Sequence, residues 1–344
     1  MVEVTKEGIL LQKTDLEFES EAVLNPAAIR VGDYVHLFYR AFRKGNYSTI
    51  GYCKLDGPLK VLERSITPVI IPFFNYESHG VEDPRIVIID DLYYLSYVAY
   101  DGVNAIGALA VADNLLHFNK LGIIVPQFSY DEFKNLIPAD TDINAKYARY
   151  NSHNDLLIKQ DKKMLVWDKN VVFFPRRIND QIWFLHRIKP DIQIVCIHDI
   201  GELTQEFWED YFRHLRKNIV LQPRHKHEVS YIGGGCPPVE TEKGWLVIYH
   251  GVHDTTKGYV YSACAALLDL TDPSKEIARL PYPLFKPEFE WELKGEVNNV
   301  VFPTGAVLFG DTLYIYYGAA DVQIAVASLS LSALLTELLL YISA

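Results

Sequence analysis

The sequence is poor in cysteine, in clustered basic charge and in long apolar runs. Its 344 residues include only four cysteines, and none of them forms a C-x-x-C pair, so neither a disulfide framework nor a zinc site is expected. The formal net charge of −11 argues against nucleic acid and against anionic membrane surfaces, because both require clustered Lys and Arg. A neutral ligand such as a sugar is compatible with this charge.

The two ends of the chain also lack targeting features. The first residues, MVEVTKEGILLQ, contain no basic stretch followed by an apolar core, so no secretory signal is expected, and a cytoplasmic or a periplasmic location fits equally. Near the other end, SLSLSALLTELLLYIS is too short and too interrupted to span a bilayer. We expect about 330–344 to form a terminal helix that packs on the body. An oligomer is compatible with the sequence.

Aromatic residues are plentiful, and they recur in a repeated pattern. A turn residue precedes an aromatic-rich alternating run, and a second run follows as a returning strand. The five pairs of runs are 32–42 with 48–56, 90–100 with 105–114, 179–188 with 192–200, 243–252 with 261–270, and 310–320 with 323–331. This pattern predicts five copies of a strand–turn–strand unit.

The spacing of the five copies leaves room for a four-stranded sheet in each. A β-sandwich is the alternative, but its turns usually recur every 8–12 residues without a longer period. The longer period favours an all-β fold, a five-bladed β-propeller with a few short helical insertions. Helices are expected within 129–137 and 201–218, with Thr204 as a cap for the second. Since no linker divides the chain, 1–344 is expected to be one domain.

The segment HGVEDPRIVIIDD (79–91) places charged residues directly before a strong strand. Pro84 is expected to hold Asp83 in extended geometry. A carboxylate beside Arg85 at a strand entrance is a candidate general acid or sugar ligand. The alternative is a turn held by an Asp–Arg pair.

Three further segments combine polar residues with strand ends. Lys169 precedes an apolar strand in WDKNVVFFP, Glu228 precedes a glycine-rich loop, and His250 and Asp321 end strand patterns. The alternatives are a solvated hairpin end for Lys169, a surface carboxylate for Glu228 and a structural histidine for His250. The pair His225 and His227 could suggest a metal, but no third ligand supports one, so no metal is expected.

Several motifs, in order along nearly the whole chain, resemble glycoside hydrolase family 130, the mannoside phosphorylases and β-1,2-mannosidases. They are NPAAIR (25–30), YRA (39–41), GVEDPRI (80–86), FFPRRIN (173–179), IGGGCPPVET (232–241), GWLVIYHGV (244–252), ALLDLTDP (266–273), VVFPTGAV (300–307) and YYGAAD (316–321). The resemblance implies a five-bladed propeller that acts with inversion on a mannosyl residue and needs no cofactor. It implies that Asp83 is the general acid, whose proton in the phosphorylases travels through a mannose hydroxyl. It places sugar contacts at Asn25, Arg40, His250 and Asp321.

One departure from the family pattern concerns phosphate. Phosphorylases of the family typically carry a Lys just before the I-G-x-G loop, where this sequence has Tyr231. The remaining cations, Arg40 and Lys169, look too few for a phosphate dianion, which must be desolvated on binding. We therefore expect an exo-acting, inverting hydrolase of β-1,2-linked mannosides.

In such a hydrolase a carboxylate must activate water, and Glu228 is the candidate base. Glu240, Glu292 and Glu296 are its rivals. An inverting hydrolase requires about 6.5–9.5 Å between its two carboxyl groups. Arg85, Lys169 and Tyr231 are expected to complete the substrate-binding set. The alternatives are a β-mannoside phosphorylase, which forms mannose 1-phosphate, and a propeller that binds mannosides without catalysis.

Overall fold

The computed structural model describes residues 2–137, 147, 163–256 and 258–343, and most of its regular structure is strand. The expectation of a mostly β fold with few short helices is confirmed. All five predicted strand pairs are present as antiparallel neighbours, for example β3 (Tyr34–Arg43) with β4 (Tyr47–Asp56).

The strands form five successive units, each with an antiparallel sheet. Unit one consists of β2 (Ala22–Val31), β3, β4 and β5 (Lys60–Arg64), and unit two of β6 (Gly80–Ile89), β7 (Leu92–Tyr100), β8 (Ala105–Ala112) and β9 (Asn119–Ile123). One parallel residue pair, Ser48 with Gly80, joins these two into a continuous hydrogen-bonded sheet. Unit three consists of β10 (Lys169–Phe173), β11 (Ile182–Arg187), β12 (Ile192–Ile197) and β13 (Ile219–Leu221).

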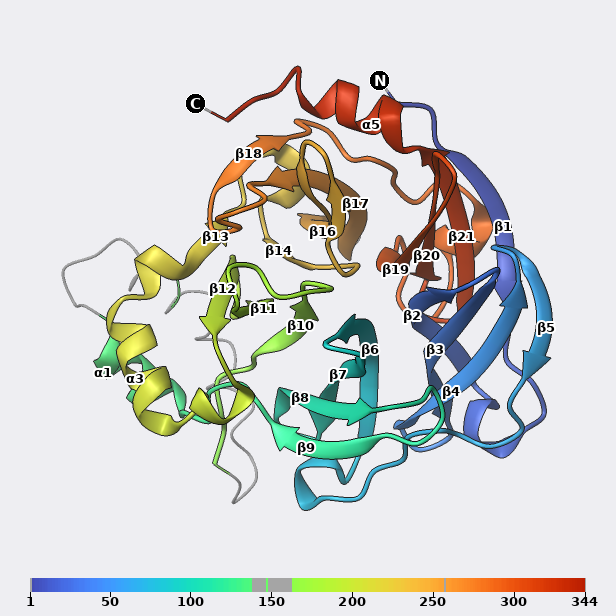
Figure 1. The fold of residues 1–344 in the computed structure, drawn as a ribbon. Helices are drawn as coiled ribbons and strands as arrows, with labels where there is room; N and C mark the ends of the chain where they lie inside the picture. The colour runs from blue at the N-terminus through green and yellow to red at the C-terminus, as the bar shows by residue number, and fades with distance from the viewer. Residues whose placement is uncertain (1, 138–146, 148–162, 257, 344) are drawn as a thin grey trace.

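The last two units include the N-terminal strand. Unit four consists of β14 (Tyr231–Gly234), β15 (Val239–Thr241), β16 (Gly244–Thr255), β17 (Gly258–Leu268) and β18 (Glu276–Arg279). Unit five consists of β19 (Val301–Phe309), β20 (Thr312–Ala319), β21 (Gln323–Ser330) and, at its outer edge, β1 (Thr5–Leu11). The five units are arranged in a ring around a common centre, and β1 beside β21 joins the beginning of the chain to its end (Figure 1).

The core lies between neighbouring units, where the alternating apolar residues of their strands meet. Phe38 of unit one, Leu95 of unit two and Phe184 of unit three are fully buried in one such cluster. Because each sheet has apolar residues on both faces, each unit packs against the units before and after it. The ends of the strands nearest the centre are thereby left free to present polar residues.

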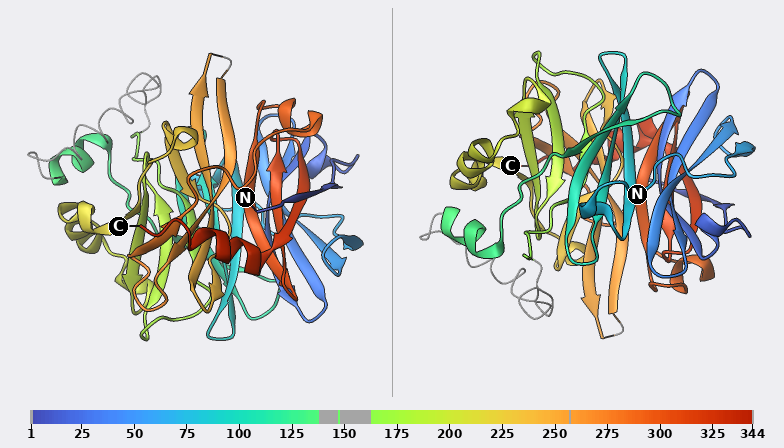
Figure 2. Two further views of the ribbon diagram at one scale, coloured as in Figure 1. Left: turned by 90° about the horizontal axis from the view of Figure 1, so that it is seen from above. Right: turned by 90° about the horizontal axis from the view of Figure 1, so that it is seen from below.

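Helices lie at the periphery (Figure 2). Ser129 caps α1 (Tyr130–Leu136). Thr204 caps α3 (Gln205–Arg213), as predicted. Leu331, Leu334 and Leu338 of α5 (Leu331–Leu338) are buried. The other helical segments are α4 (Glu290–Leu293), η1 (Glu17–Glu19), η2 (Asn75–Glu77), η4 (Ile200–Glu202), η5 (Leu215–Asn218) and η6 (Lys226–Glu228). In the described part of the chain, no helix has the length and apolarity to cross a membrane.

Among the described residues, four of the five units contain a fully buried glutamate at or near the end of a short helical turn. These residues are Glu19, Glu77, Glu228 and Glu292. Each accepts a hydrogen bond from a tyrosine on the second long strand of its unit, namely Tyr39, Tyr97, Tyr249 and Tyr317. A cation from the outermost strand lies within ion-pair distance of each, namely Arg64, Lys120, Arg279 and Lys6. We call these four groups the buried glutamate clusters. In each cluster, the hydrogen bond and the ion pair connect the turn before the inner strand to the sheet of the same unit.

Candidate active site

A cavity of about 290 Å³, here called the polar cavity, is lined by residues from all five units. Its walls are Asn25, Arg40, Glu82, Asp83, Trp167, Lys169, Asn170, Arg187, Lys189, Tyr231, His250, Tyr261, Val297, Val300, Phe302 and Asp321. Seven of the nine residues expected from the sequence lie here, namely Asn25, Arg40, Asp83, Lys169, Tyr231, His250 and Asp321. Arg85 and Glu228 do not line it.

Three of the inner strands bring an Asn or Asp into this cavity by the same irregularity of the backbone. Asn25, Asp83 and Asn170 have φ values of 50°, 49° and 54°, and each lies at an irregularity in the register of its strand. Left-handed backbone is costly for most side chains but is tolerated by Asn and Asp, and a bulge redirects the side chain. The expected extended geometry of Asp83 is therefore wrong, because the bulge overrides the influence of Pro84.

Asp83 is surrounded by donors and positive charge. Its Oδ1 accepts a hydrogen bond from Asn25 Nδ2 at 2.7 Å and lies 3.9 Å from Arg40 Nη1. Arg40 is itself held by Glu82 at 2.7 Å and by Ser48 Oγ at 2.8 Å. Burial favours the neutral acid, but Arg40, Arg85 and the Asn25 hydrogen bond outweigh it and hold the pKa of Asp83 below its ordinary value. Without a ligand, Asp83 is therefore ionised at neutral pH.

Arg85 does not line the cavity but supports the backbone around Asp83. Its guanidinium donates hydrogen bonds to the carbonyl oxygens of Gly235 at 2.6 Å, Asp83 at 2.8 Å and Pro84 at 3.1 Å. These bonds hold Arg85 against the backbone of the bulge and of the glycine-rich loop, while its Nη2 has no hydrogen-bond partner among the described residues. Because Arg85 does not line the cavity, the structure gives no support to the expected contact between Arg85 and substrate. Arg85 acts on Asp83 by position and by charge.

The wall formed by units three and four is cationic. Lys169, Arg187 and Lys189 line it, and no carboxylate within the described ranges forms an ion pair with any of them. The Nζ of Lys189 lies 3.9 Å from the ring centroid of Tyr231, and Arg187 Cζ lies 5.4 Å from it. Burial, together with Arg187 and Lys169, lowers the pKa of Lys189 to about 7. This wall suits a ligand with more than one negative charge.

Arg187 and Lys189 were missed in the sequence. Arg187 follows His186 on the second long strand of its unit, as Arg40 follows Tyr39 and His250 follows Tyr249. The shared position in the repeat was therefore the signal that could have found it. Lys189 lies just beyond the end of its strand, where no repeat position marks it.

Other residues that line the cavity offer neutral and acidic groups. The ring of His250 lies 4.5 Å from that of Phe302, and burial keeps the pKa of His250 well below its ordinary value, so this imidazole is neutral. A side chain at Gly233 would collide with His250 and with Asn170, so glycine is required there. Burial raises the pKa of Asp321 to about 6, opposed by Arg40 and reinforced by Asp83. Such groups can orient sugar hydroxyls.

Glu228 is not available as a base. It is fully buried in the unit-four cluster, where it accepts hydrogen bonds from the backbone N–H groups of Arg224 at 2.9 Å and His225 at 3.1 Å and from the hydroxyl of Tyr249. The assignment of Glu228 as base is therefore corrected: a carboxylate so committed and outside the cavity cannot activate a water at the sugar.

The rival bases do not line the polar cavity either. Glu292 belongs to the unit-five cluster, and Glu240 pairs with Arg176 at 2.9 Å. Glu240 borders a larger groove of about 810 Å³ beside α5, which is lined by leucines and by polar and charged residues. Glu296 acts on Asp321 only by charge. In the described part of the chain, Glu82 and Asp321 are thus the carboxylates that share the cavity with Asp83.

A family model described as beta-1,4-mannooligosaccharide phosphorylase, that of glycoside hydrolase family 130, matches residues 5–338. The chain belongs to glycoside hydrolase family 130. Two family relatives from Thermoanaerobacter sp. (strain X514) are similar over almost their whole length. The 1,2-beta-oligomannan phosphorylase is 32% identical over 94% of this chain and 95% of its own, and the beta-1,2-mannobiose phosphorylase 33% identical over 95% and 96%. These curated relatives are phosphorylases rather than mannosidases, which corrects the expected nearness to the mannosidases.

Solved structures of the family share the fold. The beta-1,2-mannobiose phosphorylase of Listeria innocua, in complex with beta-1,2-mannobiose, matches with a TM-score of 0.72 at 22% identity, covering 97% of this chain and 99% of its own. A second structure, from work on family members described as hydrolases of beta-1,2 mannosidic linkages in Candida mannan, matches with a TM-score of 0.71 at 21% identity and covers 93% and 90%. At this level of identity the likeness shows the fold alone.

Proposed function

We propose that this family 130 enzyme is a β-1,2-mannoside phosphorylase, which transfers a mannosyl residue to inorganic phosphate. The observation that carries the proposal is the cationic wall of Lys169, Arg187 and Lys189, which lines the cavity without carboxylate partners in the described chain. The curated relatives named above are phosphorylases of β-1,2-linked mannosides. Lys189, beside the ring of Tyr231, supplies the positive charge that Tyr231 itself cannot.

In the proposed reaction, a phosphate oxygen forms a bond to C1 of the terminal mannosyl residue as the glycosidic C1–O bond breaks. The departing oxygen receives a proton that originates on Asp83. The products are mannose 1-phosphate with inverted configuration and the shortened sugar. Asn25, Arg40, His250 and Asp321 are proposed to hold the mannosyl hydroxyls, and Tyr231 to border the phosphate.

Phosphate also answers the question of how Asp83 can act as an acid. Arg40, Arg85 and Lys169 hold its pKa down while the cavity is empty. A bound dianion neutralises part of this charge and so raises the pKa of Asp83 toward the range of a proton donor. A water molecule brings no such charge, so this electrostatic arrangement favours phosphorolysis over hydrolysis.

We further propose that the ring of five units is a five-bladed β-propeller and a single catalytic domain, with the site at its centre. Support comes from the five antiparallel units and from the pairing of β1 with β21, which closes the ring with strands from both ends of the chain. A radial arrangement of this kind leaves only short sheet edges and gathers loops from every unit at one place. That geometry explains how residues as distant in sequence as Asn25 and Asp321 share one cavity.

Hydrolysis remains the second candidate, favoured by Tyr231 in place of the family lysine. The test incubates the purified chain with β-1,2-mannobiose, with and without phosphate, and measures mannose and mannose 1-phosphate separately. A phosphorylase forms mannose 1-phosphate and is inactive without phosphate. Release of two mannoses without phosphate would replace the proposal by the hydrolase, and binding without turnover would replace it by a sugar-binding propeller.

A further inference from the structure

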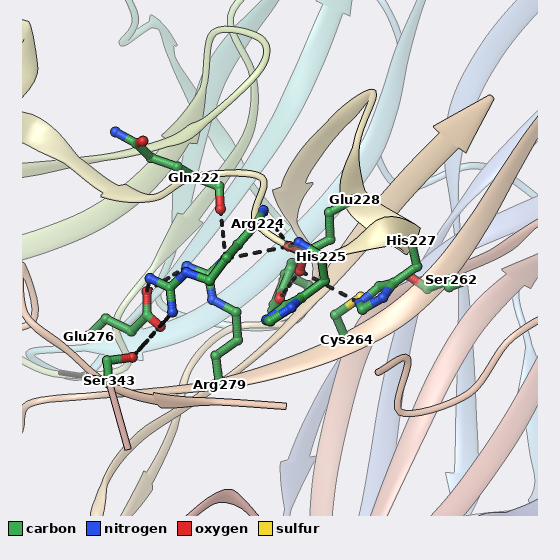
Figure 3. Close-up of polar contacts among 11 residues, drawn as sticks. Gln222, Arg224, His225, His227, Glu228, Ser262, Cys264, Glu276, Arg279 and Ser343 are labelled. Atoms are coloured by element: carbon green, nitrogen blue, oxygen red, sulfur yellow. Dashed lines mark hydrogen bonds and ion pairs between the residues drawn. The ribbon is translucent and has the colours of Figure 1, made fainter. Parts of the chain in front are cut away.

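The buried glutamate cluster of unit four contains a set of potential metal ligands. His227, Glu228 and Cys264 are all buried, and their ligand atoms lie within 4.8 Å of one another. The three side chains come together from η6 and β17 (Figure 3). The Nε2 of His227 lies 3.7 Å from Glu228 Oε1 and has no hydrogen-bond partner among the described residues, although its side chain is only 9% exposed. A buried, unpartnered nitrogen is unusual and calls for a ligand.

The three other clusters serve as internal controls for this one. The residue before the buried glutamate is Phe18, Tyr76 or Trp291 in units one, two and five, but His227 in unit four. The residue that faces the cluster tyrosine on the next strand is Gly51, Ala108 or Ala325, but Cys264 in unit four. Two positions that otherwise hold apolar or weakly polar side chains thus both change to metal-ligating residues in the same unit.

A third change in unit four makes room between these ligands. Two residues after the cluster tyrosine, the other units have Ala41, Ala99 and Ala319, whereas unit four has Gly251. A Cβ at Gly251 would lie 3.0 Å from Cys264 Sγ and 3.0 Å from Glu228 Cγ. The missing methyl group is what allows the thiol and the carboxylate to approach each other.

The cluster cation also differs in unit four. Arg64 and Lys120 donate hydrogen bonds to their glutamates at 2.9 and 2.5 Å, and Lys6 donates one to Glu292. Arg279 instead donates to Glu276 at 2.5 Å and to the carbonyl oxygen of Gln222 at 2.7 Å, and it remains 3.6 Å from Glu228 (Figure 3). The negative charge of Glu228 is therefore less fully neutralised than that of its counterparts.

We propose that unit four binds one Zn²⁺ ion through His227 Nε2, the Cys264 thiolate and Glu228 Oε1, with water as the fourth ligand. Nitrogen, sulfur and oxygen are the ligand atoms that Zn²⁺ takes in tetrahedral sites, with bonds of about 2.0–2.3 Å. On binding, the thiol of Cys264 loses its proton to solvent, so each ion releases one proton. The sequence alone suggested no metal because the His225–His227 pair had no third ligand; folding supplies Glu228 and Cys264.

The site is separate from the polar cavity, since none of its three ligands lines that cavity. Zn²⁺ there joins η6 to β17, and β14 begins at Tyr231, shortly after Glu228. The ion thereby fixes the segment that leads to Tyr231 in the cationic wall. The inference does not depend on the reaction that the enzyme catalyses.

The test uses the full chain, with any affinity tag removed, after treatment with a chelator. Addition of Zn²⁺ should give one tightly bound ion per chain by mass spectrometry of the metal, a higher Tm and the release of one proton. Co²⁺ should give the near-ultraviolet charge-transfer absorption of a thiolate ligand. If one equivalent of Zn²⁺ neither binds nor shifts Tm, the proposal is overturned.

Two variants restore residues found in the other clusters, so both are expected to fold. Cys264→Ala and His227→Phe should each weaken Zn²⁺ binding at least tenfold, and Cys264→Ala should abolish the cobalt absorption. Cys196→Ala, which removes a half-buried thiol in unit three, is the matched control and should bind as the wild type does. Unchanged binding in both cluster variants would also overturn the proposal.

Discussion

Glu77 and Asp83 are two buried carboxylates of unit two, close together in sequence and opposite in character. Glu77 accepts hydrogen bonds from the backbone N–H groups of Phe73 and Phe74, from the hydroxyl of Tyr97 and from Lys120 Nζ. Its side chain is completely buried, and these donors satisfy both of its oxygens. Glu77 therefore has a structural role and stabilises the fold.

Asp83 has far less support from its own chain. It accepts one side-chain hydrogen bond, from Asn25, and its side chain remains 12% exposed in the polar cavity. Around it, Asn25 Oδ1, Asn170 Oδ1 and His250 Nδ1 have no hydrogen-bond partner among the described residues. The difference teaches that a satisfied buried carboxylate holds a fold together, whereas an incompletely satisfied one marks the place of a ligand.

The largest effect should follow from Asp83→Asn. Removal of a general acid typically costs about 10²–10⁴-fold in rate, so kcat should fall by that factor. The side-chain oxygen of an asparagine can still accept the hydrogen bond from Asn25, and only the 3.9 Å ion pair with Arg40 is lost. Tm and the affinity for β-1,2-mannobiose, measured by calorimetry, should therefore change little. The control Asp33→Asn alters an exposed carboxylate and should leave kcat as it is. If the variant retained most of its turnover, Asp83 could not be the general acid.

The opposite outcome is expected for Glu77→Gln. Breaking a buried ion pair costs about 3–5 kcal/mol, so the free energy of unfolding in urea should fall by that amount. The kcat of the protein that remains folded should be close to that of the wild type, since Glu77 does not line the cavity. Glu290→Gln removes an exposed carboxylate from α4 and should cost less than about 0.5 kcal/mol. If Glu77→Gln lowered kcat and left stability intact, the contrast with Asp83 would be lost.

The strands could be predicted from the sequence because the alternation of aromatic residues that marks them is a local pattern. Seven of the nine expected site residues, which follow strand ends or family motifs, lie together in the polar cavity. Glu228 was misassigned because its partners come from three separate segments. A signal did exist: the glutamate precedes its tyrosine by 20, 20, 21 and 25 residues in the four clusters. Read as a repeat, this spacing identifies Glu228 as a structural residue.

The positive charge of the cavity could not be judged from the sequence for a different reason. The absence of a lysine at Tyr231 suggested that the phosphate set was incomplete. Only folding shows that Lys189 lies over the ring of Tyr231 and that Arg187 stands beside it. A charge can be replaced from a neighbouring strand, so the loss of one family residue does not establish the loss of its function.

The smallest effect concerns Lys189, which lines the cavity that contains Asp83 but not Glu77. Its pKa of about 7 means that the ammonium is charged below pH 7 and increasingly neutral above it. Phosphate affinity should therefore weaken as pH rises through 7. Lys189→Arg keeps its charge throughout this range.

The measurement is the KM for phosphate of the wild type divided by that of Lys189→Arg, from pH 6 to 8.5. The ratio cancels the titration of phosphate itself, which is common to both enzymes. It should be nearly flat well below pH 7 and rise by about thirtyfold at pH 8.5, as expected when one group with a pKa of about 7 loses its charge. A ratio independent of pH would show that Lys189 stays charged or does not touch phosphate, and the positive charge would then rest on Lys169 and Arg187.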